Sequence, residues 1–442
     1  MSARTPDPAR RAAYRVLRRV DADGAYANLA MAAEAAGLDR RDAAFATELC
    51  FGTCRALGTY DAVIEAAAGR PVAALDPPVL DVLRLGAHQL LAMRVPTHAA
   101  VSATVNLAGA EVGRRVTGLV NAVLRKVAAR PLEEWLDRLT AGRDALDTLA
   151  LTTGHPRWIV EAWQAALADR PDAELAAALA ADNLAPTSHL VIRPGLAEVA
   201  ELGGQPARYS PFGAYTTGAP QEVAAVAQGS AGVQDEGSQL VALALSRVDA
   251  PGGPWLDLCA GPGGKAALLA GLAIGQGERL VAGELQPHRA GLVARNLAGY
   301  SGEHCPVTVV ADGTRPAWRS GSFARVMADV PCTGLGALRR RPESRWRRSP
   351  DDLPGLVALQ SALLRSAIAA ARPGGVVAYV TCSPHLSETR EVVAGATGVE
   401  LLQTADYLPE VPDAAAGRFV QLWPHRHGTD AMFLALLRVA PR

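Results

Sequence analysis

The segment Trp255-Leu-Asp-Leu-Cys-Ala-Gly-Pro-Gly-Gly-Lys265 decides the fold of the C-terminal part of this chain. It reads as a short buried strand that enters a glycine-rich loop, and a helical stretch follows the loop. Glycine lets the backbone approach a ligand closely, and the N-terminus of the next helix attracts anionic groups. Gly261, Gly263 and Ala266 satisfy the G-x-G-x-x-G/A pattern of nucleotide-binding loops. The pattern predicts the first strand, ligand loop and helix of a Rossmann-like α/β domain.

Strand and helix patterns alternate from residue 246 to the C-terminus. Short apolar runs indicate strands, and helical segments separate most of them. Alternation of this kind predicts a doubly wound parallel sheet that binds ligands across the carboxyl ends of its strands. We expect strands at Trp255–Leu258, Arg279–Gly283, Val307–Ala311, Phe323–Ala328, Val376–Val380 and Met432–Leu437.

Two cysteines directly follow two of these strands. Cys332 ends the segment Asp329-Val-Pro-Cys, and Cys382 is the centre of Thr381-Cys-Ser383. Glu284 follows the second strand, where a carboxylate binds ribose hydroxyls. The glycine loop and this acid suit a nicotinamide cofactor and S-adenosylmethionine equally, so the loop alone leaves the cofactor open. The two cysteines favour S-adenosylmethionine.

Methyl transfer to C5 of a pyrimidine is the reaction that best explains this combination. C5 of cytosine is a poor nucleophile, but a thiolate that adds at C6 raises the electron density at C5. The C5 proton must then leave, which needs a general base, and a carboxyl group near N3 can offset charge on the ring. Cys382 or Cys332 fits the nucleophile, and Asp329 fits the ring partner. The commoner role of a cysteine is that of a small buried apolar residue, but two at sheet ends beside a cofactor loop favour catalysis.

Composition limits the class of protein. A chain of 442 residues predicts two or three domains, and 49% hydrophobic residues are typical of a globular protein. The formal net charge is zero, so a polyanion would need local basic patches. Met1–Arg11 has no apolar signal segment, and no uncharged apolar run has the length of a membrane span. Six cysteines in this length do not form a disulfide framework. We therefore expect a cytoplasmic protein with free thiols and no membrane contact.

The chain divides into three parts and a connecting segment. Residues 6–130 have helical periodicity and no strand alternation, which predicts an all-α domain. Residues 131–149 are charged, lack a clear core face and read as a linker. Residues 150–245 mix helices with an expected strand at Ser188–Ile192, which predicts a small α+β substrate-binding subdomain. Residues 246–442 form the predicted catalytic domain.

From about residue 150 to its end, the chain resembles the Sun/Fmu type of RNA cytosine-5 methyltransferases. The resemblance rests on Asp257–Lys265, Asp329–Cys332 and Thr381–Ser383. Residues 6–130 are similar to the NusB-like RNA-binding domain, and this fusion is typical of the bacterial enzyme that acts on 16S ribosomal RNA. The resemblance implies an S-adenosylmethionine-dependent rRNA methyltransferase that takes its target base out of the stack. It also implies RNA rather than DNA as the substrate, and we expect a monomer.

The family pattern also implies a role for each matching residue. Glu284 would hold the ribose, Asp312 the adenine region and Asp329 the active-site end of the cofactor. Cys382 would be the nucleophile, and Cys332 would assist breakdown of the adduct and release of the RNA. The loop around the cofactor would consist of Cys259, Ala260, Gly261, Pro262, Gly263, Gly264 and Lys265.

Two positions depart from the family pattern. Glu284 replaces the usual aspartate, and Thr389 stands where the family often has asparagine. His425 and His427 have no third candidate ligand nearby, so we expect no metal.

Arginines form two basic clusters, and each has two interpretations. Arginine side chains after Cys332 could form a solvated helix face, but their place beside the expected site favours contact with RNA phosphates. Arginines of the first helix could be solubilising or could face RNA. The first cluster consists of Arg339, Arg340, Arg341, Arg345, Arg347 and Arg348, and the second of Arg10, Arg11, Arg15, Arg18 and Arg19.

Two alternative functions also fit parts of the sequence. A nicotinamide-dependent oxidoreductase would use the same glycine loop. A non-catalytic RNA-binding factor would use the NusB-like part and keep the sheet as a scaffold. Binding of S-adenosylhomocysteine distinguishes the first from a methyltransferase, and the effect of Cys382→Ala distinguishes the second.

Overall fold

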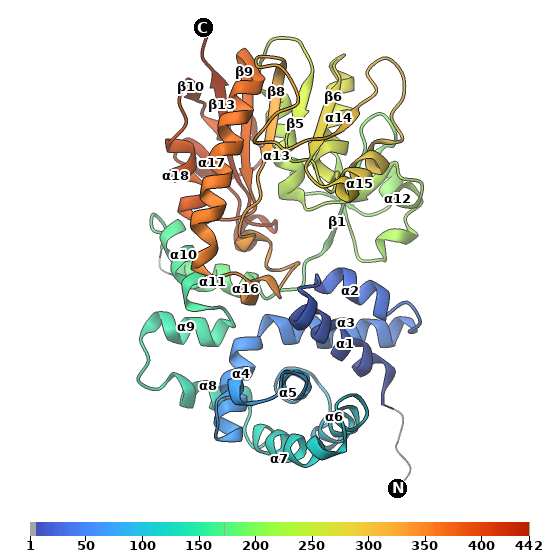
Figure 1. The fold of residues 1–442 in the computed structure, drawn as a ribbon, viewed down its shortest axis with the longest axis vertical. Coiled ribbons are helices and arrows are strands. Elements are labelled where there is room, and N and C mark those ends of the chain that lie inside the picture. The colour runs from blue at the N-terminus through green and yellow to red at the C-terminus, as the bar shows by residue number, and fades with distance from the viewer. Residues whose placement is uncertain (1–5, 172, 442) are drawn as a thin grey trace. The chain divides into compact units, whose positions relative to one another are not determined.

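A computed structural model describes residues 6–171 and 173–441, which fold into two compact units. The helical unit consists of Met1–Gln164, Asp172–Asn183 and Arg340–Arg347. The sheet unit consists of Ala165–Pro171, Leu184–Arg339 and Arg348–Arg442. The short segment Arg340–Arg347 therefore belongs to the helical unit, although the residues on both sides of it belong to the sheet unit. Figure 1 shows the helices and strands of each unit.

The helical unit has no strand among its described residues, which confirms the predicted all-α fold. Helix α1 (Pro8–Asp23) begins where the Asp7 side chain accepts a hydrogen bond from the backbone N–H of Arg10 at 2.9 Å. It ends at Gly24, whose φ of +63° suits glycine. The other helices are α2 (Ala27–Glu34), α3 (Arg40–Arg55), α4 (Leu57–Ala68), α5 (Pro77–Leu91), α6 (Thr97–Glu111), α7 (Thr117–Val127), α8 (Leu132–Thr140), α9 (Ala145–Thr153), α10 (Arg157–Ala166), α11 (Ala173–Ala181) and α16 (Ser344–Arg347).

One apolar core holds helices α1 to α8 together. Leu17, Leu49, Ile64 and Leu83 come from four different helices and are almost completely buried in it. Trp135 of α8 joins the same core, although the sequence of residues 131–149 shows no clear core face. The indole N–H of Trp135 donates a hydrogen bond to the carbonyl of Val127 at 3.0 Å, which fixes α8 to the end of α7.

The sheet unit begins with a small antiparallel sheet of order β2-β3-β1-β4. The expected strand at Ser188–Ile192 is present as β1, and it pairs with β3 and β4. Leu190 and Ile192 belong to an apolar cluster of their own. The remaining elements are β2 (Gln205–Pro206), β3 (Gly213–Thr216), α12 (Ala224–Ala227) and β4 (Ala231–Val233).

The large sheet has nine strands, and its main path runs β11-β12-β13-β9-β8-β5-β6-β7. Strands β5 to β9 are parallel, whereas β13 is antiparallel to β9. The prediction of a parallel sheet is therefore wrong at this edge, where β13 lies antiparallel to β9 and pairs with the short strands β10 and β12. The strands are β5 (Trp255–Asp257), β6 (Leu280–Glu284), β7 (Val307–Val310), β8 (Phe323–Asp329), β9 (Ala371–Thr381), β10 (Val399–Leu401), β11 (Ala415–Ala416), β12 (Phe419–Gln421) and β13 (Phe433–Val439).

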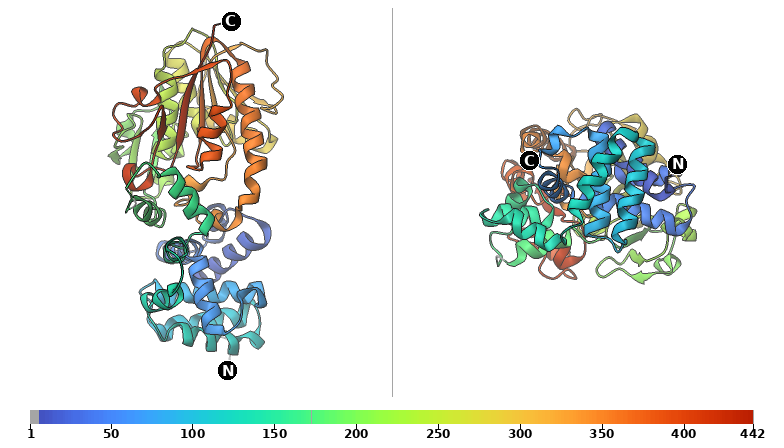
Figure 2. Two further views of the ribbon diagram at one scale, coloured as in Figure 1. Left: turned by 90° about the vertical axis from the view of Figure 1, so that its left-hand side faces the viewer. Right: turned by 90° about the horizontal axis from the view of Figure 1, so that it is seen from below.

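Helices cover both faces of this sheet, as Figure 2 shows. Val376, Ala378 and Val380 of β9 face one apolar cluster, and Val377 and Tyr379 face the other. This alternation is the period of two expected for a strand that is buried on both faces. The first cluster contains α13 (Glu236–Arg247), α14 (Gly264–Gly275) and α15 (Pro287–Leu297), and the second contains α17 (Leu353–Ala370) and α18 (Arg390–Ala394).

The segment Pro350–Ala370, which contains α17, is long and apolar enough to cross a membrane by length and composition alone. In the sheet unit it is the crossover between β8 and β9. Leu363, Leu364 and Ala367 are buried against the sheet. Core helices of globular proteins pass the same test, so this composition is weak evidence for a membrane segment.

The chain order reverses on the two sides of β5, whose neighbours are β6 and β8. Ligands of such sheets bind beyond the carboxyl ends of the strands at this reversal. The ends of β5, β8 and β9 carry the glycine loop, Asp329 and the two cysteines, so the fold places the predicted site residues at one edge.

Candidate active site

The glycine loop between β5 and α14 is closely packed against the end of β6. The backbone N–H of Gly261 donates a hydrogen bond to Oε2 of Glu284 at 3.0 Å. A Cβ atom at Gly261 would lie only 2.1 Å from that oxygen, so a larger residue would displace the Glu284 carboxylate from this position. Gly263 has a φ of +114°, which side chains rarely adopt. Both glycines are therefore needed for the loop conformation that the sequence predicts.

Glu284 and Asp312 lie at the ends of neighbouring strands, as the sequence analysis expects for cofactor contacts. Glu284 is buried and also accepts a hydrogen bond from the backbone N–H of Gln286 at 2.9 Å. Asp312 follows β7 and accepts hydrogen bonds from the hydroxyl and the backbone N–H of Thr314, and these bonds lower its pKa. Their contacts with ribose and adenine stay predictions.

The two cysteines lie next to each other. Parallel pairing of β8 and β9 sets Asp329 beside Val380, and the backbone N–H of Val330 donates to the carbonyl of Val380 at 3.0 Å. Both chains then leave the sheet, and the Sγ atoms of Cys332 and Cys382 are 3.5 Å apart. Both are free thiols. A distance of this size lets one sulfur donate a hydrogen bond to the other.

The pKa values distinguish the thiols of this site. The hydrogen bond from Cys332 lowers the pKa of Cys382, and the Lys265 ammonium group also lowers it, against the opposing effects of burial and of the Asp329 carboxylate. The same hydrogen bond raises the pKa of Cys332, as does burial. Burial also raises the pKa of Cys259 in the glycine loop. Cys382 is therefore the thiol that most readily becomes a thiolate, which is the nucleophilic form.

An ion pair joins the glycine loop to the cysteine edge. Nζ of Lys265 is 2.9 Å from Oδ2 of Asp329. Burial alone would lower the pKa of Lys265, but the Asp329 carboxylate raises it overall. Asp257, at the end of β5, is 1% exposed, and neither of its carboxylate oxygens has a hydrogen-bond partner of normal geometry among the described residues.

Comparisons with known proteins agree with this geometry. The family model described as 16S rRNA methyltransferase RsmB/F matches residues 242–438, and the NusB family model matches residues 7–129. A protein of Mycobacterium tuberculosis (strain CDC 1551 / Oshkosh) named as methyltransferase MT1451 is 52% identical, over 98% of this chain and 96% of the relative. Ribosomal RNA small subunit methyltransferase B of Pseudomonas putida is 33% identical, over 87% of each chain.

The chain belongs to the RsmB/F family of 16S rRNA methyltransferases.

A solved structure supports the fold. The crystal structure of PH0851 matches with a TM-score of 0.78 and 21% identity, and the match covers 99% of this chain and 100% of that chain. At this identity the match shows the shared fold alone. The RsmB/F assignment itself comes from the family model and the curated relatives.

Membership of the RsmB/F family decides the cofactor in favour of S-adenosylmethionine and against the nicotinamide alternative. The acidic side chains around the glycine loop fit S-adenosylmethionine. Asp257, Glu284 and Asp329 surround the loop with carboxyl groups, which suit a cationic sulfonium and an ammonium group better than an anionic pyrophosphate. S-adenosylmethionine would lie along the loop from Cys259 to Lys265.

A buried polar network connects the two loops that carry Cys332 and Cys382, and the sequence did not predict it. Glu388 is completely buried and accepts hydrogen bonds from residues that directly follow the two cysteines, Thr333 and Ser383. The sequence contains one weak signal of this network, a glutamate six residues after Cys382. Its partners could not be found from spacing, because they come from three separate segments of the chain.

A second group that sequence reasoning missed consists of Asp235, Arg339 and Asp430. The Arg339 guanidinium group is 3.3 Å from an Asp430 oxygen and 3.7 Å from an Asp235 oxygen. The backbone N–H of Asp430 also donates a hydrogen bond to a carboxylate oxygen of Asp235 at 3.0 Å. Arg339 is therefore a buried partner of two carboxylates.

The prediction that the arginine cluster after Cys332 contacts RNA is wrong for several of its members. Arg345 is completely buried in the helical unit, where it donates hydrogen bonds to the carbonyls of Arg55 and Gly154. Arg347 donates to the carbonyls of Val20 and Ala25. These side chains hold Arg340–Arg347 in the helical unit, and sequence alone cannot distinguish a solvated arginine from one that binds backbone carbonyls.

The arginines of α1 also have intramolecular partners. Arg11 pairs with Glu111 at 2.5 Å, and Arg18 pairs with the buried Asp81 at 2.9 Å. Arg10 donates a hydrogen bond to Gln89 at 2.7 Å. Most of this cluster therefore stabilises the helical unit.

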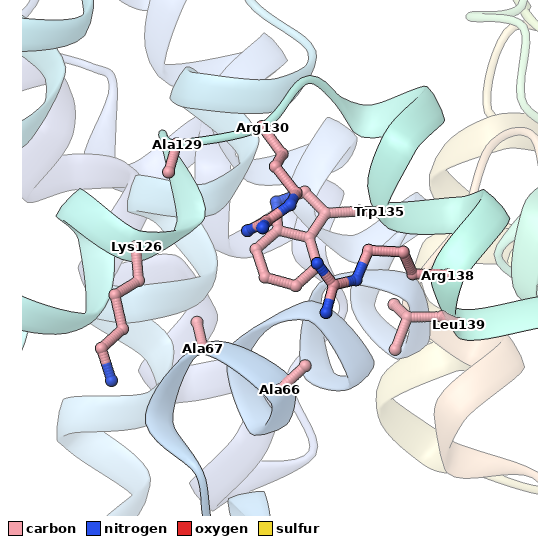
Figure 3. A pocket seen from close by; sticks show the side chains of 8 residues that line it. All are labelled: Ala66, Ala67, Lys126, Ala129, Arg130, Trp135, Arg138 and Leu139. Atoms are coloured by element: carbon pink, nitrogen blue, oxygen red, sulfur yellow. The ribbon is translucent and has the colours of Figure 1, made fainter.

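A different basic site of the helical unit is a pocket of about 330 Å³ between α4, α7 and α8. Lys126, Arg130 and Arg138 line it together with Trp135, and no acidic residue does. Figure 3 shows the guanidinium groups of Arg130 and Arg138 near the Trp135 ring. The Arg130 guanidinium carbon is 5.5 Å from the centre of that ring. Within the described part of the chain, none of the three cations has a carboxylate partner.

Proposed function

We propose that this chain methylates C5 of a cytosine in 16S ribosomal RNA through a covalent bond between Cys382 and C6 of the base. The observation that carries the proposal is the 3.5 Å separation of two free thiols that follow the carboxyl ends of β8 and β9. A cytosine C5 methyltransferase needs two groups at one base, a nucleophile at C6 and a group that acts at C5. The names of the relatives from Pseudomonas putida and Xanthomonas campestris support the small ribosomal subunit as the source of the RNA.

In this mechanism Cys382 is the nucleophile. Its thiolate adds to C6, and the electron pair of the C5–C6 double bond becomes available at C5. S-adenosylmethionine, when bound, supplies an electrophilic methyl group for that carbon. Asp329 lies beside Lys265, and its carboxyl group would supply or hold a proton at N3 and so offset the charge that develops on the ring. The C5 proton then leaves, the double bond re-forms, and the Cys382 thiolate is expelled.

Cys332 assists the last step. Before the reaction, its hydrogen bond to Cys382 raises its pKa and keeps it a thiol. A thioether sulfur is neutral, so this effect ends once Cys382 has bonded to C6, and Cys332 can then release its proton to water and become a thiolate that acts as a base. It can accept the C5 proton at that stage, either directly or through water. The two thiols therefore act in sequence rather than in competition.

The helical unit would bind the RNA substrate, and its basic pocket is the best candidate for a phosphate contact. Lys126, Arg130 and Arg138 give three positive charges around one pocket, and the face of Trp135 lies beside them. Phosphate groups of RNA bind such clusters of unpaired cations. We expect the chain to act as a monomer on RNA in the cytoplasm, without DNA or a membrane as a partner.

Mapping of 5-methylcytosine in 16S rRNA from cells with and without this protein tests the substrate. The expected result is one or a few cytosines that lose their C5 methyl group when the protein is absent. Purified protein and S-adenosylmethionine should restore those sites in vitro. A methylation map that does not change would reject 16S rRNA as the substrate.

Two cysteine variants test the chemistry. Cys382→Ala should abolish methyl transfer, because the attack on C6 has no other nucleophile. Cys332→Ala should accumulate a covalent protein–RNA complex that survives denaturing electrophoresis. If Cys382→Ala keeps the function in cells, the chain acts as a non-catalytic RNA-binding factor instead.

A further inference from the structure

Glu388 belongs to η7 (Leu386–Glu388), the short turn after the Cys382 loop, and its side chain reaches back to the sheet edge. Oε1 accepts hydrogen bonds from the backbone N–H of Thr333 at 2.8 Å and from Nε2 of Gln360 at 3.0 Å. Oε2 accepts from the hydroxyl of Ser383 at 2.7 Å and from that of Thr333. Four donors thus converge on one carboxylate, which uses its whole capacity as an acceptor.

The partners of Glu388 are the neighbours of the two thiols in the chain. Thr333 directly follows Cys332, and Ser383 directly follows Cys382. The hydroxyls of Thr333 and Ser383 are also 3.1 Å apart, so the two loops meet at this carboxylate. Gln360 of α17 completes the connection, because its Nε2 donates to the carbonyl of Pro331 at 2.9 Å as well as to Glu388.

We propose that Glu388 is a positioning residue that sets the distance between Cys332 and Cys382 during breakdown of the RNA adduct. The proposal rests on the proposed cytosine C5 chemistry. C5 is bonded directly to C6, so a group that acts on the C5 proton must stay within a few ångströms of the attacking sulfur. Glu388 itself touches neither the base nor the cofactor, and it acts through the loops that carry the thiols.

A side chain with the length of glutamate is required for this role. All four donors point at it, and the backbone N–H of Thr333 and the amide Nε2 of Gln360 cannot reverse their direction. The hydroxyls of Thr333 and Ser383 can rotate and accept instead. Glutamine at position 388 can therefore keep the connection, with its oxygen toward the N–H groups and its amide nitrogen toward the hydroxyls. Aspartate keeps the charge but is one methylene shorter, so it cannot reach both loops.

The test compares three variants of the full chain: Glu388→Ala, Glu388→Asp and Glu388→Gln. Each is incubated with an unmethylated 16S rRNA transcript and S-adenosylmethionine that carries a tritiated methyl group. Released methylated RNA and covalent protein–RNA complex are measured separately. We expect Glu388→Ala and Glu388→Asp to slow adduct breakdown by roughly tenfold to a hundredfold, as for other displaced catalytic groups, and to accumulate the complex. Glu388→Gln should release RNA at close to the wild-type rate.

A matched control separates positioning from general loss of stability. Thr404 is completely buried in the same unit, and its hydroxyl accepts a hydrogen bond from the N–H of Leu436 at 3.2 Å, away from the cysteine loops. Thr404→Val should lower the unfolding temperature and the active fraction without accumulating complex, because the molecules that stay folded have normal thiols. A purely structural role for Glu388 would give this same pattern in Glu388→Ala and Glu388→Asp, and that result would overturn the proposal.

Glu388→Gln gives a second test of the positioning role. If it accumulates as much complex as Glu388→Ala, the reach of the side chain is not what matters, and the positioning role is rejected. Failure of the underlying chemistry gives a different result. If the cytosine C5 chemistry is wrong, Cys332→Ala would also accumulate no covalent complex. If only the positioning role is wrong, Cys332→Ala accumulates the complex and the Glu388 variants do not.

Discussion

Asp257 should destabilise the sheet unit at neutral and higher pH, and Asp257→Asn should relieve this effect. Burial, and then the nearby Asp329 carboxylate, raises the pKa of Asp257 from 3.8 to about 7. Between about pH 4 and about pH 7 the unfolded chain has released this proton while the folded chain still binds it. An increase in pH therefore favours unfolding over that range.

The size of the effect follows from the two pKa values. The interval from 3.8 to about 7 corresponds to about 4 kcal/mol of unfolding free energy, which is lost in full above pH 7. Asparagine has nearly the same shape and stays neutral at every pH. The variant should therefore match the wild type below about pH 4, where Asp257 is protonated in both the folded and the unfolded chain, and be more stable by up to about 4 kcal/mol near pH 8.

Hydrogen exchange of the peptide that contains β5 measures this difference within one unit of a two-unit protein. Wild type and Asp257→Asn are compared at the same pH, so the intrinsic exchange rate cancels. At pH 8 the variant should exchange up to about a thousandfold more slowly in β5, and at about pH 3.5 the two should nearly agree. If the difference between the two proteins is the same at both pH values, Asp257 does not titrate in this range and the reasoning is wrong.

Three further predictions concern other charged groups. Lys265→Met should raise the pKa of Cys382, because the ammonium group of Lys265 lowers that pKa in the wild type. The pH midpoint of Cys382 alkylation by iodoacetamide should therefore move upward. An unchanged midpoint would contradict the role of Lys265. Arg138→Ala should weaken binding of 16S rRNA and reduce the slope of log affinity against log salt by about one, as expected for one lost phosphate contact, while Arg247→Ala should not. Arg345→Met should destabilise the helical unit by about 3 kcal/mol, seen as faster hydrogen exchange in α3, because it leaves the carbonyls of Arg55 and Gly154 without this buried donor.

The sequence determined the local parts of this protein. The spacing of Gly261 and Gly263 specifies a strand, a loop and a helix, because Gly263 has a φ that side chains rarely adopt and Gly261 leaves room for the Glu284 carboxylate. The apolar runs before Cys332 and Cys382 specify two buried strands. Parallel strands end at one edge of a sheet, so the meeting of the thiols could be predicted without coordinates.

Tertiary structure alone decided the parts that depend on distant partners. The direction of β13 follows from how the chain returns to β9, which no local pattern encodes. Arg345 and Arg339 look alike in sequence, yet one binds backbone carbonyls in the helical unit and the other pairs with carboxylates in the sheet unit. The four donors of Glu388 come from segments far apart in the chain, and only folding brings them to one buried charge. A side chain's burial and partners are properties of the packed molecule, so its own sequence neighbourhood does not contain them.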